Sequence, residues 1–250
     1  MKTIAILLAA LAFGTQVAAA AGNVYGSADA PLAGQVLDTD VHTADAEELR
    51  YVVLRELTDR YAAERGIEVQ QGEIEAYVAA VARSMAEDRK QRAAERERLA
   101  QQLQSGTLSP AEREALSSQL RVLDELLAPE GAGTPGSDGK GESPEDRAAR
   151  EQIAAAFILQ WKINRALYQQ YGGRIIFQQG GPEPLDAYRL FLEEQQKQGA
   201  FKILDPALEA GFWRYYRTDA IHSFYPAGSA EEARAFAQPW WLSDNPEQAQ

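Results

Sequence analysis

Few residues of this chain have the types and the spacing that catalysis requires. Two pairs of adjacent carboxylates, Glu193-Glu194 and Glu231-Glu232, could in principle provide an acid and a base. Adjacent residues of a helix point in different directions, however, and a chain with 37 acidic residues is expected to contain such pairs. His222 lies among aromatic residues, where a packed histidine is commoner than a proton shuttle. We therefore predict no catalytic residues.

Motifs for phosphate, nucleotide or metal chemistry are also missing from the sequence. It contains no G-x-S-x-G, Walker, dinucleotide-binding or H-E-x-x-H motif. Gly172-Gly173 and Gly180-Gly181 lack the spacing of a phosphate loop and are predicted to form turns. With no cysteine and only His42 and His222, disulfides, thiolate zinc sites and histidine-rich metal sites are excluded. We predict neither a metal nor a cofactor, and no enzymatic activity.

Aromatic side chains are the one chemical type that the sequence concentrates. Seventeen of the 22 aromatic residues lie between Phe157 and Trp241. Aromatic residues give a large contact area at low entropic cost, so an exposed group of them binds polypeptides well. The simpler alternative is that they form the core of the C-terminal half. The candidates for contact with a client or partner are Phe212, Trp213, Tyr215, Tyr216, Phe224, Trp240 and Trp241.

The N-terminal sequence predicts export from the cytoplasm. Lys2 precedes the apolar run Ile4–Phe13, and the small residues Ala18–Ala21 follow, as in a cleavable signal peptide over residues 1–20. The run is too short to span a hydrocarbon core about 30 Å thick, which argues against a membrane anchor. We predict a periplasmic protein without membrane insertion, with secretion as the alternative.

The charge of the chain narrows the class of partner. A formal net charge of −12 opposes binding to nucleic acid, whose affinity for proteins depends on neutralising phosphates with Lys and Arg. Acidity also favours solubility, which is the simpler explanation for it. The predicted partner is a polypeptide or a small molecule, and the sequence predicts no oligomeric state.

Helices account for most of the first half of the predicted fold. After an extended segment at residues 21–43, apolar residues at helical spacing predict a helix over Ala46–Arg65 and a second one from Gln70. Glu87–Leu127 is highly charged, with a turn near Pro110, and predicts a protruding, coiled-coil-like helical hairpin. The alternative is a single long solvated helix. Residues 44–128 would thus form a helical pair plus the hairpin.

A Gly- and Pro-rich linker at residues 129–143 separates this part from an aromatic-rich half at residues 144–250, predicted to pack on the first. The stretch Ile153–Gln179 opens as a strongly apolar helix, which predicts burial on several sides. It ends as a short strand, and Phe201–Leu204 is a second extended run. The predicted fold is therefore mainly α, with one or two short strands.

Residues Gln35–Ala82 resemble the N-terminal chaperone module of the SurA-type periplasmic chaperones. The similarity lies in an extended segment Val36–Val41, a capping Thr43, the link Gly66-Ile67-Glu68-Val69 and the helix start Glu73-Ile74. The extended segment lacks the Asn-Gly turn of that family, and no parvulin-type isomerase domain can be placed. The resemblance implies a helical module of the SurA N-terminal type that holds unfolded exported polypeptides, without isomerase catalysis.

Two functions from different classes follow as expectations. In the first, a cradle between the first helix pair and the central helix binds unfolded or partly folded exported polypeptides. In the second, the chain is a structural or adaptor subunit of a cell-envelope complex, with the aromatic residues as a fixed interface. An unrecognised enzyme is the third alternative, and it would need a deep pocket with convergent acids.

Overall fold

The structure is a computed structural model that describes residues 24–26, 29–105, 108–128, 143–178 and 180–242. These residues form two compact units, each made of two separate stretches of sequence. The sheet unit contains the described residues up to Asp59 together with Leu192–Thr218, and the helical unit contains Arg60–Phe191 and the residues from Asp219 onward. This differs from the two consecutive halves predicted. The signal peptide and residues 129–142 of the linker lie outside the described residues.

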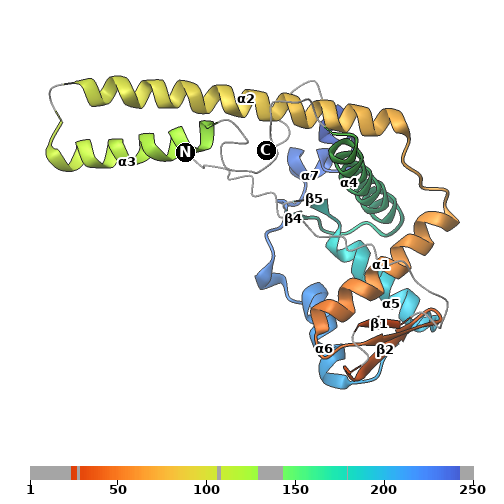
Figure 1. Ribbon diagram of the computed structural model, residues 1–250. Coiled ribbons are helices and arrows are strands. Elements are labelled where there is room, and N and C mark those ends of the chain that lie inside the picture. The colour runs from red at the N-terminus through yellow and green to blue at the C-terminus, as the bar shows by residue number, and fades with distance from the viewer. Residues whose placement is uncertain (1–23, 27–28, 106–107, 129–142, 179, 243–250) are drawn as a thin grey trace. The chain divides into compact units, whose positions relative to one another are not determined.

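Seven α-helices dominate the described residues, so the prediction of a mainly α-helical fold is confirmed (Figure 1). The prediction of one or two strands is too low, because six short strands are present in the same residues. Strand formation depends on pairing with distant segments, and a local pattern of three to five residues carries little of that information.

The sheet unit is built on a four-stranded sheet with the order β1-β3-β2-β6. Its strands are β1 (Val24–Gly26), β2 (Leu32–Val36), β3 (Thr39–His42) and β6 (Phe201–Ile203). β2 pairs antiparallel with β3 and with β6, and β1 pairs parallel with β3. The stretch read as one extended segment is thus a hairpin. Leu37 closes its two-residue turn with φ of 52°, a left-handed conformation that leucine rarely adopts.

Two helices of this unit carry its core. α1 (Ala46–Glu64) belongs to it up to Asp59, and α6 (Pro206–Arg217) begins at the cap Asp205, whose carboxylate accepts the N–H groups of Ala207 and Leu208. Gly211 lets α6 approach α1, since a Cβ there would lie 2.6 Å from that of Ala46. The buried core comprises Val36, Val41, Leu49, Val53, Leu57, Leu192, Phe201, Phe212, Trp213 and Tyr216.

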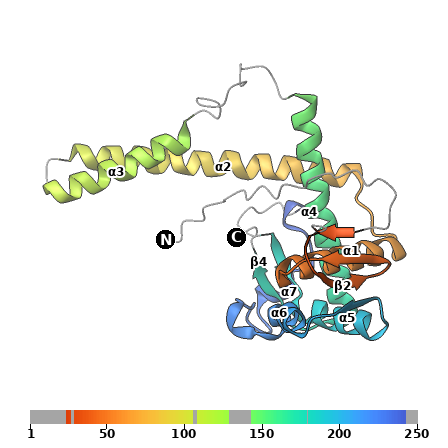
Figure 2. The same ribbon diagram turned by 60° about the horizontal axis from the view of Figure 1, so that its bottom comes forward.

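The helical unit contains the long helix α2 (Gln71–Gln104), with α3 (Pro110–Leu127) folded back along its far half (Figures 1 and 2). Leu99 is buried between them, and the Arg96 side chain lies 2.7 Å from the Asp124 carboxylate. These contacts form the hairpin predicted for Glu87–Leu127, and they exclude a single long helix. Ser109 caps α3 and forms a capping box with Glu112.

The core of the helical unit lies where α4 (Pro144–Tyr171) crosses the first half of α2 (Figure 2). Beside α4 lie the hairpin strands β4 (Ile176–Gln178) and β5 (Gly181–Glu183), and α5 (Leu185–Lys197), whose residues up to Phe191 belong to this unit. The chain ends with η1 (Asp219–Ile221), α7 (Ala230–Arg234) and η2 (Trp240–Leu242). One buried cluster comprises Ala80, Ile158, Trp161, Ile175, Phe236 and Trp241.

A buried amide fixes α4 against its neighbours. The Asn164 side chain donates a 2.9 Å hydrogen bond to the carbonyl of Pro182 in β5 and accepts one of 2.5 Å from the Tyr188 hydroxyl of α5. Buried polar groups of this kind stabilise a fold only when they are paired, so they specify one packing arrangement. They hold α4 in place while its first turns project past the cluster.

Candidate functional site

An open groove of about 350 Å³ lies between α2 and α4. Its floor is apolar and its rim carries both signs of charge. The lining residues are Ile74, Glu75, Val78, Ala79 and Ala82 from α2, and Arg147, Arg150 and Glu151 from α4. The groove therefore lies between the second helix of the predicted pair and the central helix, where the sequence predicted a cradle.

A charged contact joins the first turn of α2 to α4. The Lys162 ammonium of α4 lies 2.6 Å from the Glu73 carboxylate and donates to the carbonyl of Glu68 at 2.7 Å. Glu73 also accepts the backbone N–H of Gln70 in a capping box. Burial opposes ionisation of Glu73, but the bonds from Lys162 and Gln70 outweigh it and hold its pKa below the ordinary value. The start of α2 is thus held against α4 by these contacts.

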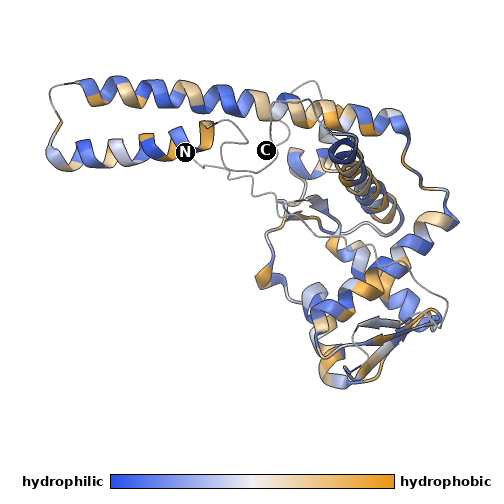
Figure 3. Cartoon of the chain, viewed as in Figure 1, coloured by the Kyte–Doolittle hydropathy of each residue, from blue (hydrophilic) through white to orange (hydrophobic). Residues whose placement is uncertain are grey.

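The two helices that form the groove also carry exposed apolar side chains outside its lining. Ile153 and Phe157 follow Arg150 on the same face of α4, and they are 49% and 40% exposed. Met85, 48% exposed, follows Ala82 on α2. Figure 3 shows hydrophobic residues on α2 near its crossing with α4 and a largely hydrophilic far half. Adjacent large apolar residues at this exposure are typical of a surface that binds another molecule.

The apolar surface continues into the core through a row of aromatic rings. Phe157 stacks on Tyr77, with ring centroids 6.1 Å apart and an interplanar angle of 14°. Tyr77 in turn contacts Trp241 edge-on at 5.2 Å, and Trp241 contacts Trp161 at 5.7 Å. Burial raises the pKa of the Tyr77 phenol, so this ring is neutral near pH 7. The row joins an exposed apolar surface to a buried one.

Most of the aromatic residues predicted to bind a client are in the core instead. Phe212, Trp213 and Tyr216 are at most 4% exposed, and they form part of the core of the sheet unit. The spacing explains this correction, because α6 buries one face and residues 212, 213 and 216 share it. Tyr215 points to the side, where the Arg50 guanidinium lies 4.0 Å from its ring centroid.

The remaining candidates lie in the helical unit. Phe224 is half-buried, with the Arg174 guanidinium 4.4 Å from its ring centroid, and Trp241 is 5% exposed. The side chain of Trp240 lies outside the described residues. The predicted client-binding residues therefore do not form one exposed surface.

The exposure of Ile153 and Phe157 was not predicted. Their apolar spacing indicated burial, and Trp161 and Leu167 on the same helix are indeed buried. The first three turns of α4 project past the buried cluster, and no local signal in the sequence marks how far a helix extends beyond its partner. The prediction that this helix is buried on several sides thus fails in its first half, where Ile153 and Phe157 are exposed.

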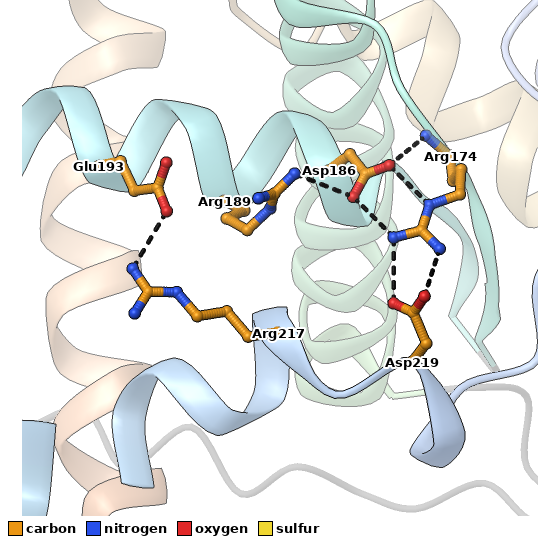
Figure 4. Close-up of polar contacts among 6 residues, drawn as sticks. All are labelled: Arg174, Asp186, Arg189, Glu193, Arg217 and Asp219. Carbon is orange, nitrogen blue, oxygen red and sulfur yellow. Dashed lines mark hydrogen bonds and ion pairs between the residues drawn. The ribbon is translucent and has the colours of Figure 1, made fainter. Parts of the chain in front are cut away.

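Charged residues of the helical unit form ion pairs that join its elements (Figure 4). The Arg174 guanidinium binds the Asp186 carboxylate at 2.8 Å and the Asp219 carboxylate at 2.7 Å, which joins β4, α5 and η1. Hydrogen bonds from Arg174 hold the pKa of both carboxyls below the ordinary value, and those to the two aspartates raise the pKa of Arg174. Arg189 also contacts Asp186, at 3.5 Å.

The carboxylates of the adjacent acidic pairs are bound to separate partners. Glu193 pairs with Arg217 at 3.1 Å within the sheet unit (Figure 4), whereas the neighbouring Glu194 accepts a hydrogen bond from Gln198. In the second pair, Glu231 lies 3.8 Å from Arg234 and Glu232 accepts the backbone N–H of Gly228. Each carboxylate has its own partner, so neither pair converges on one point.

The described residues contain neither a candidate metal-binding cluster nor a candidate membrane-spanning helix. No cluster of three or more His, Cys, Asp or Glu side chains there could hold a metal ion. None of the described helices combines the length and the apolar character needed to cross a membrane.

Comparison with protein-family models, with curated proteins and with solved structures gives no significant match to this chain.

Proposed function

We propose that this protein is a holdase-type chaperone that binds unfolded or partly folded exported polypeptides without isomerase catalysis. The observation that carries the proposal is the open groove between α2 and α4, together with the exposed apolar side chains of Ile153 and Phe157 on α4. Its location supports the expectation of a cradle between these helices.

The chemistry of the groove suits a variable polypeptide. Its apolar floor favours any segment with aliphatic or aromatic side chains, at about 25 cal/mol per Å² of apolar surface removed from water. Met85 at one end adds a flexible side chain, a residue type common at surfaces that accept several partners. An open groove also imposes little shape selection. These properties fit a holdase better than a receptor for one ligand.

Features outside the groove support the same role. The acidic chain would keep a protein with an exposed apolar groove soluble when it is empty. The predicted signal peptide places the protein in the compartment through which unfolded exported chains pass. The resemblance of Gln35–Ala82 to the SurA-type chaperone module points to the same class of client.

The proposal is tested with an unfolded outer-membrane barrel protein diluted from denaturant. At an equimolar ratio, the chaperone is expected to suppress its aggregation, as measured by light scattering. Because Trp161 and Trp241 belong to the buried cluster against which the groove residue Ile74 packs, client binding should also change the tryptophan fluorescence. A lack of suppression together with an unchanged spectrum would remove the proposed function.

The alternative, a structural or adaptor subunit of an envelope complex, rested on the aromatic residues as a fixed interface. Phe212, Trp213, Tyr216 and Trp241 are buried within their own units, so that support is lost. Co-purification separates the two functions. One stoichiometric partner would favour the adaptor, and a mixture of substoichiometric clients would favour the chaperone.

A further inference from the structure

The hairpin of α2 and α3 buries few of its side chains. In the described stretch from Glu87 to Gln104, α2 buries only Leu99, and α3 buries none of its residues. Figures 1 and 2 show the hairpin extending beyond the other described elements of the helical unit. Helices gain most of their stability by packing an apolar face, and two helices leave much of that face in water. The leucines of α3 that face α2 are accordingly only half-buried: Leu116, Leu120, Leu123 and Leu127.

A second apolar row of residues runs along one flank of α3. Val122 and Leu126 in this row are 55% and 53% exposed. The steps between its members are four, three and four residues, as on the contact face of a coiled coil. At about 100° per residue, the row lies roughly a quarter turn from the leucines that face α2, so α2 leaves it exposed. We call this row the α3 stripe, and it consists of Ala115, Gln119, Val122 and Leu126.

Polar contacts occupy the other flank of the hairpin. The Arg96 side chain of α2 lies 2.7 Å from the Asp124 carboxylate of α3. One turn of α3 further on, the Arg89 guanidinium donates to the carbonyl of Leu127 at 2.8 Å. These contacts fix the register of α3 on α2. The α3 stripe is therefore presented to solvent in one orientation, on the side away from the ion pair.

The charge of the hairpin indicates what the α3 stripe can bind. The chain carries a net charge of −12, so two copies of it repel each other over most of their surface. The α3 stripe has no charged residue, and the nearest one, Glu112, is held in the capping box of Ser109. Across Glu87–Leu127, eight acidic and seven basic residues give a net charge of only −1. Two copies of the chain can therefore meet at the hairpin with little repulsion.

The α3 stripe is also complementary to itself when two copies of α3 run antiparallel. A two-fold axis midway between Gln119 and Val122 places Ala115 of one copy opposite Leu126 of the other, and each such contact then occurs twice. A small side chain faces a large one at both ends of the stripe, as close packing requires. A parallel arrangement would set Leu126 against Leu126 and would leave a gap between the two alanines.

We propose that two copies of this protein associate through the α3 stripe, with their α3 helices antiparallel, so that the two hairpins form a four-helix layer. The proposal goes beyond the proposed function, because no residue of the groove takes part in it. The contact covers about 18 Å of helix, which puts it at the small end of specific interfaces. The dimer is therefore reversible and depends on protein concentration.

Sedimentation velocity tests the association over a series from about 1 µM to 1 mM protein. The unmodified chain is expected to pass from monomer to dimer within this range. Val122→Ser with Leu126→Ser should raise the dissociation constant about tenfold or more, since each copy loses two apolar side chains from the contact. The matched control is Leu190→Ser with Ile221→Ser, where side chains 39% and 52% exposed lie elsewhere in the helical unit. This pair should leave the dissociation constant unchanged, and circular dichroism checks that both variants are folded.

Three results would overturn the proposal. The unmodified chain could stay monomeric over the whole series, or its dimer could survive the α3 substitutions. Equal weakening by the control pair would show that association depends on general surface hydrophobicity. Weaker client binding by the α3 variant of a monomeric chain would identify the stripe as a client site instead.

A second measurement tests the antiparallel geometry with the α3 stripe intact. The chain has no cysteine, so Arg121→Cys and Glu114→Cys each introduce one site for a spin label, and both lie on a face of α3 away from the stripe. In the antiparallel dimer, the two labels at residue 121 are separated by about 2 Å along the helix axis, and those at residue 114 by about 20 Å. Pulsed electron paramagnetic resonance should therefore give the longer distance at residue 114. Equal distances at the two sites would refute the antiparallel contact.

Discussion

The paired substitution Ile153→Ser and Phe157→Ser is expected to weaken client binding strongly. Both side chains lie on the exposed face of α4, and neither takes part in the buried cluster. Serine keeps the helix backbone and removes the apolar surface that a client would cover. The loss should therefore appear in binding and, through the buried part of each side chain, also in stability.

The size of the effect follows from the exposed fractions. Full burial of an Ile or Phe side chain is worth about 1.5–3 kcal/mol. With 49% and 40% of these side chains exposed, a client can bury rather less than half of that surface at each. The two together contribute about 1.3–2.7 kcal/mol, which corresponds to an affinity about ten- to 100-fold weaker. The buried fractions predict a loss of similar size in the free energy of unfolding.

The assay is fluorescence anisotropy of a labelled unfolded client, at a temperature where circular dichroism shows both variants folded. The matched control is Val122→Ser with Leu126→Ser on α3, where the side chains are 55% and 53% exposed and the helix is not one of the two that form the groove. The control is expected to bind like the unmodified chain. Equal weakening by both pairs would show that general surface hydrophobicity binds the client. An unchanged affinity of the α4 pair would refute the assignment of the groove.

Two further predictions concern stability. Leu37→Gly should raise the free energy of unfolding by about 0.5–1 kcal/mol in urea titrations. The reason is that glycine adopts the φ of 52° without the strain that leucine carries there. A lower stability would show that the contacts of the Leu37 side chain outweigh its backbone strain. Asp186→Asn should cost about 1–2 kcal/mol at pH 7, since Arg174 stabilises the carboxylate and is itself about half exposed. The folded pKa of Asp186 is lowered, so its contribution is present above pH about 4 and is lost as the pH falls through the folded pKa. The two stability curves should therefore converge in acid, and a constant gap would refute the role of the charge.

Helix boundaries were predictable where the signals are local. The pairs Ser109-Pro110 and Ser143-Pro144 mark in the sequence where α3 and α4 begin, and Gly172 follows the last residue of α4. A cap, an N1 proline and a C-terminal glycine each act within one turn of the helix, so the sequence alone specifies them. The turn at Leu37 was missed because its residue type does not favour a positive φ.

Pairings between distant residues could not be predicted in this way. Phe201–Ile203 was recognised as an extended run, but nothing near it indicates that it adds to the hairpin of residues 32–42. The same holds for the groove. Its floor residues Ile74 and Val78 have the spacing of an inner helical face, and their partial exposure depends on how α4 crosses that face. Burial of the aromatic residues of α6 likewise depends on a sheet completed from both ends of the chain.

The pairing of β2 with β6 has a consequence for the order of folding. Gly34 lies opposite Ile203, so this contact closes a loop of roughly 170 residues, and closing such a loop costs entropy before any bond is made. During synthesis, the N-terminal hairpin emerges long before its partner strand. Contacts of short sequence separation form faster, so the α2–α3 hairpin should fold first. The sheet unit is then completed last, when the residues up to Thr218 are available, and until then its apolar face stays uncovered.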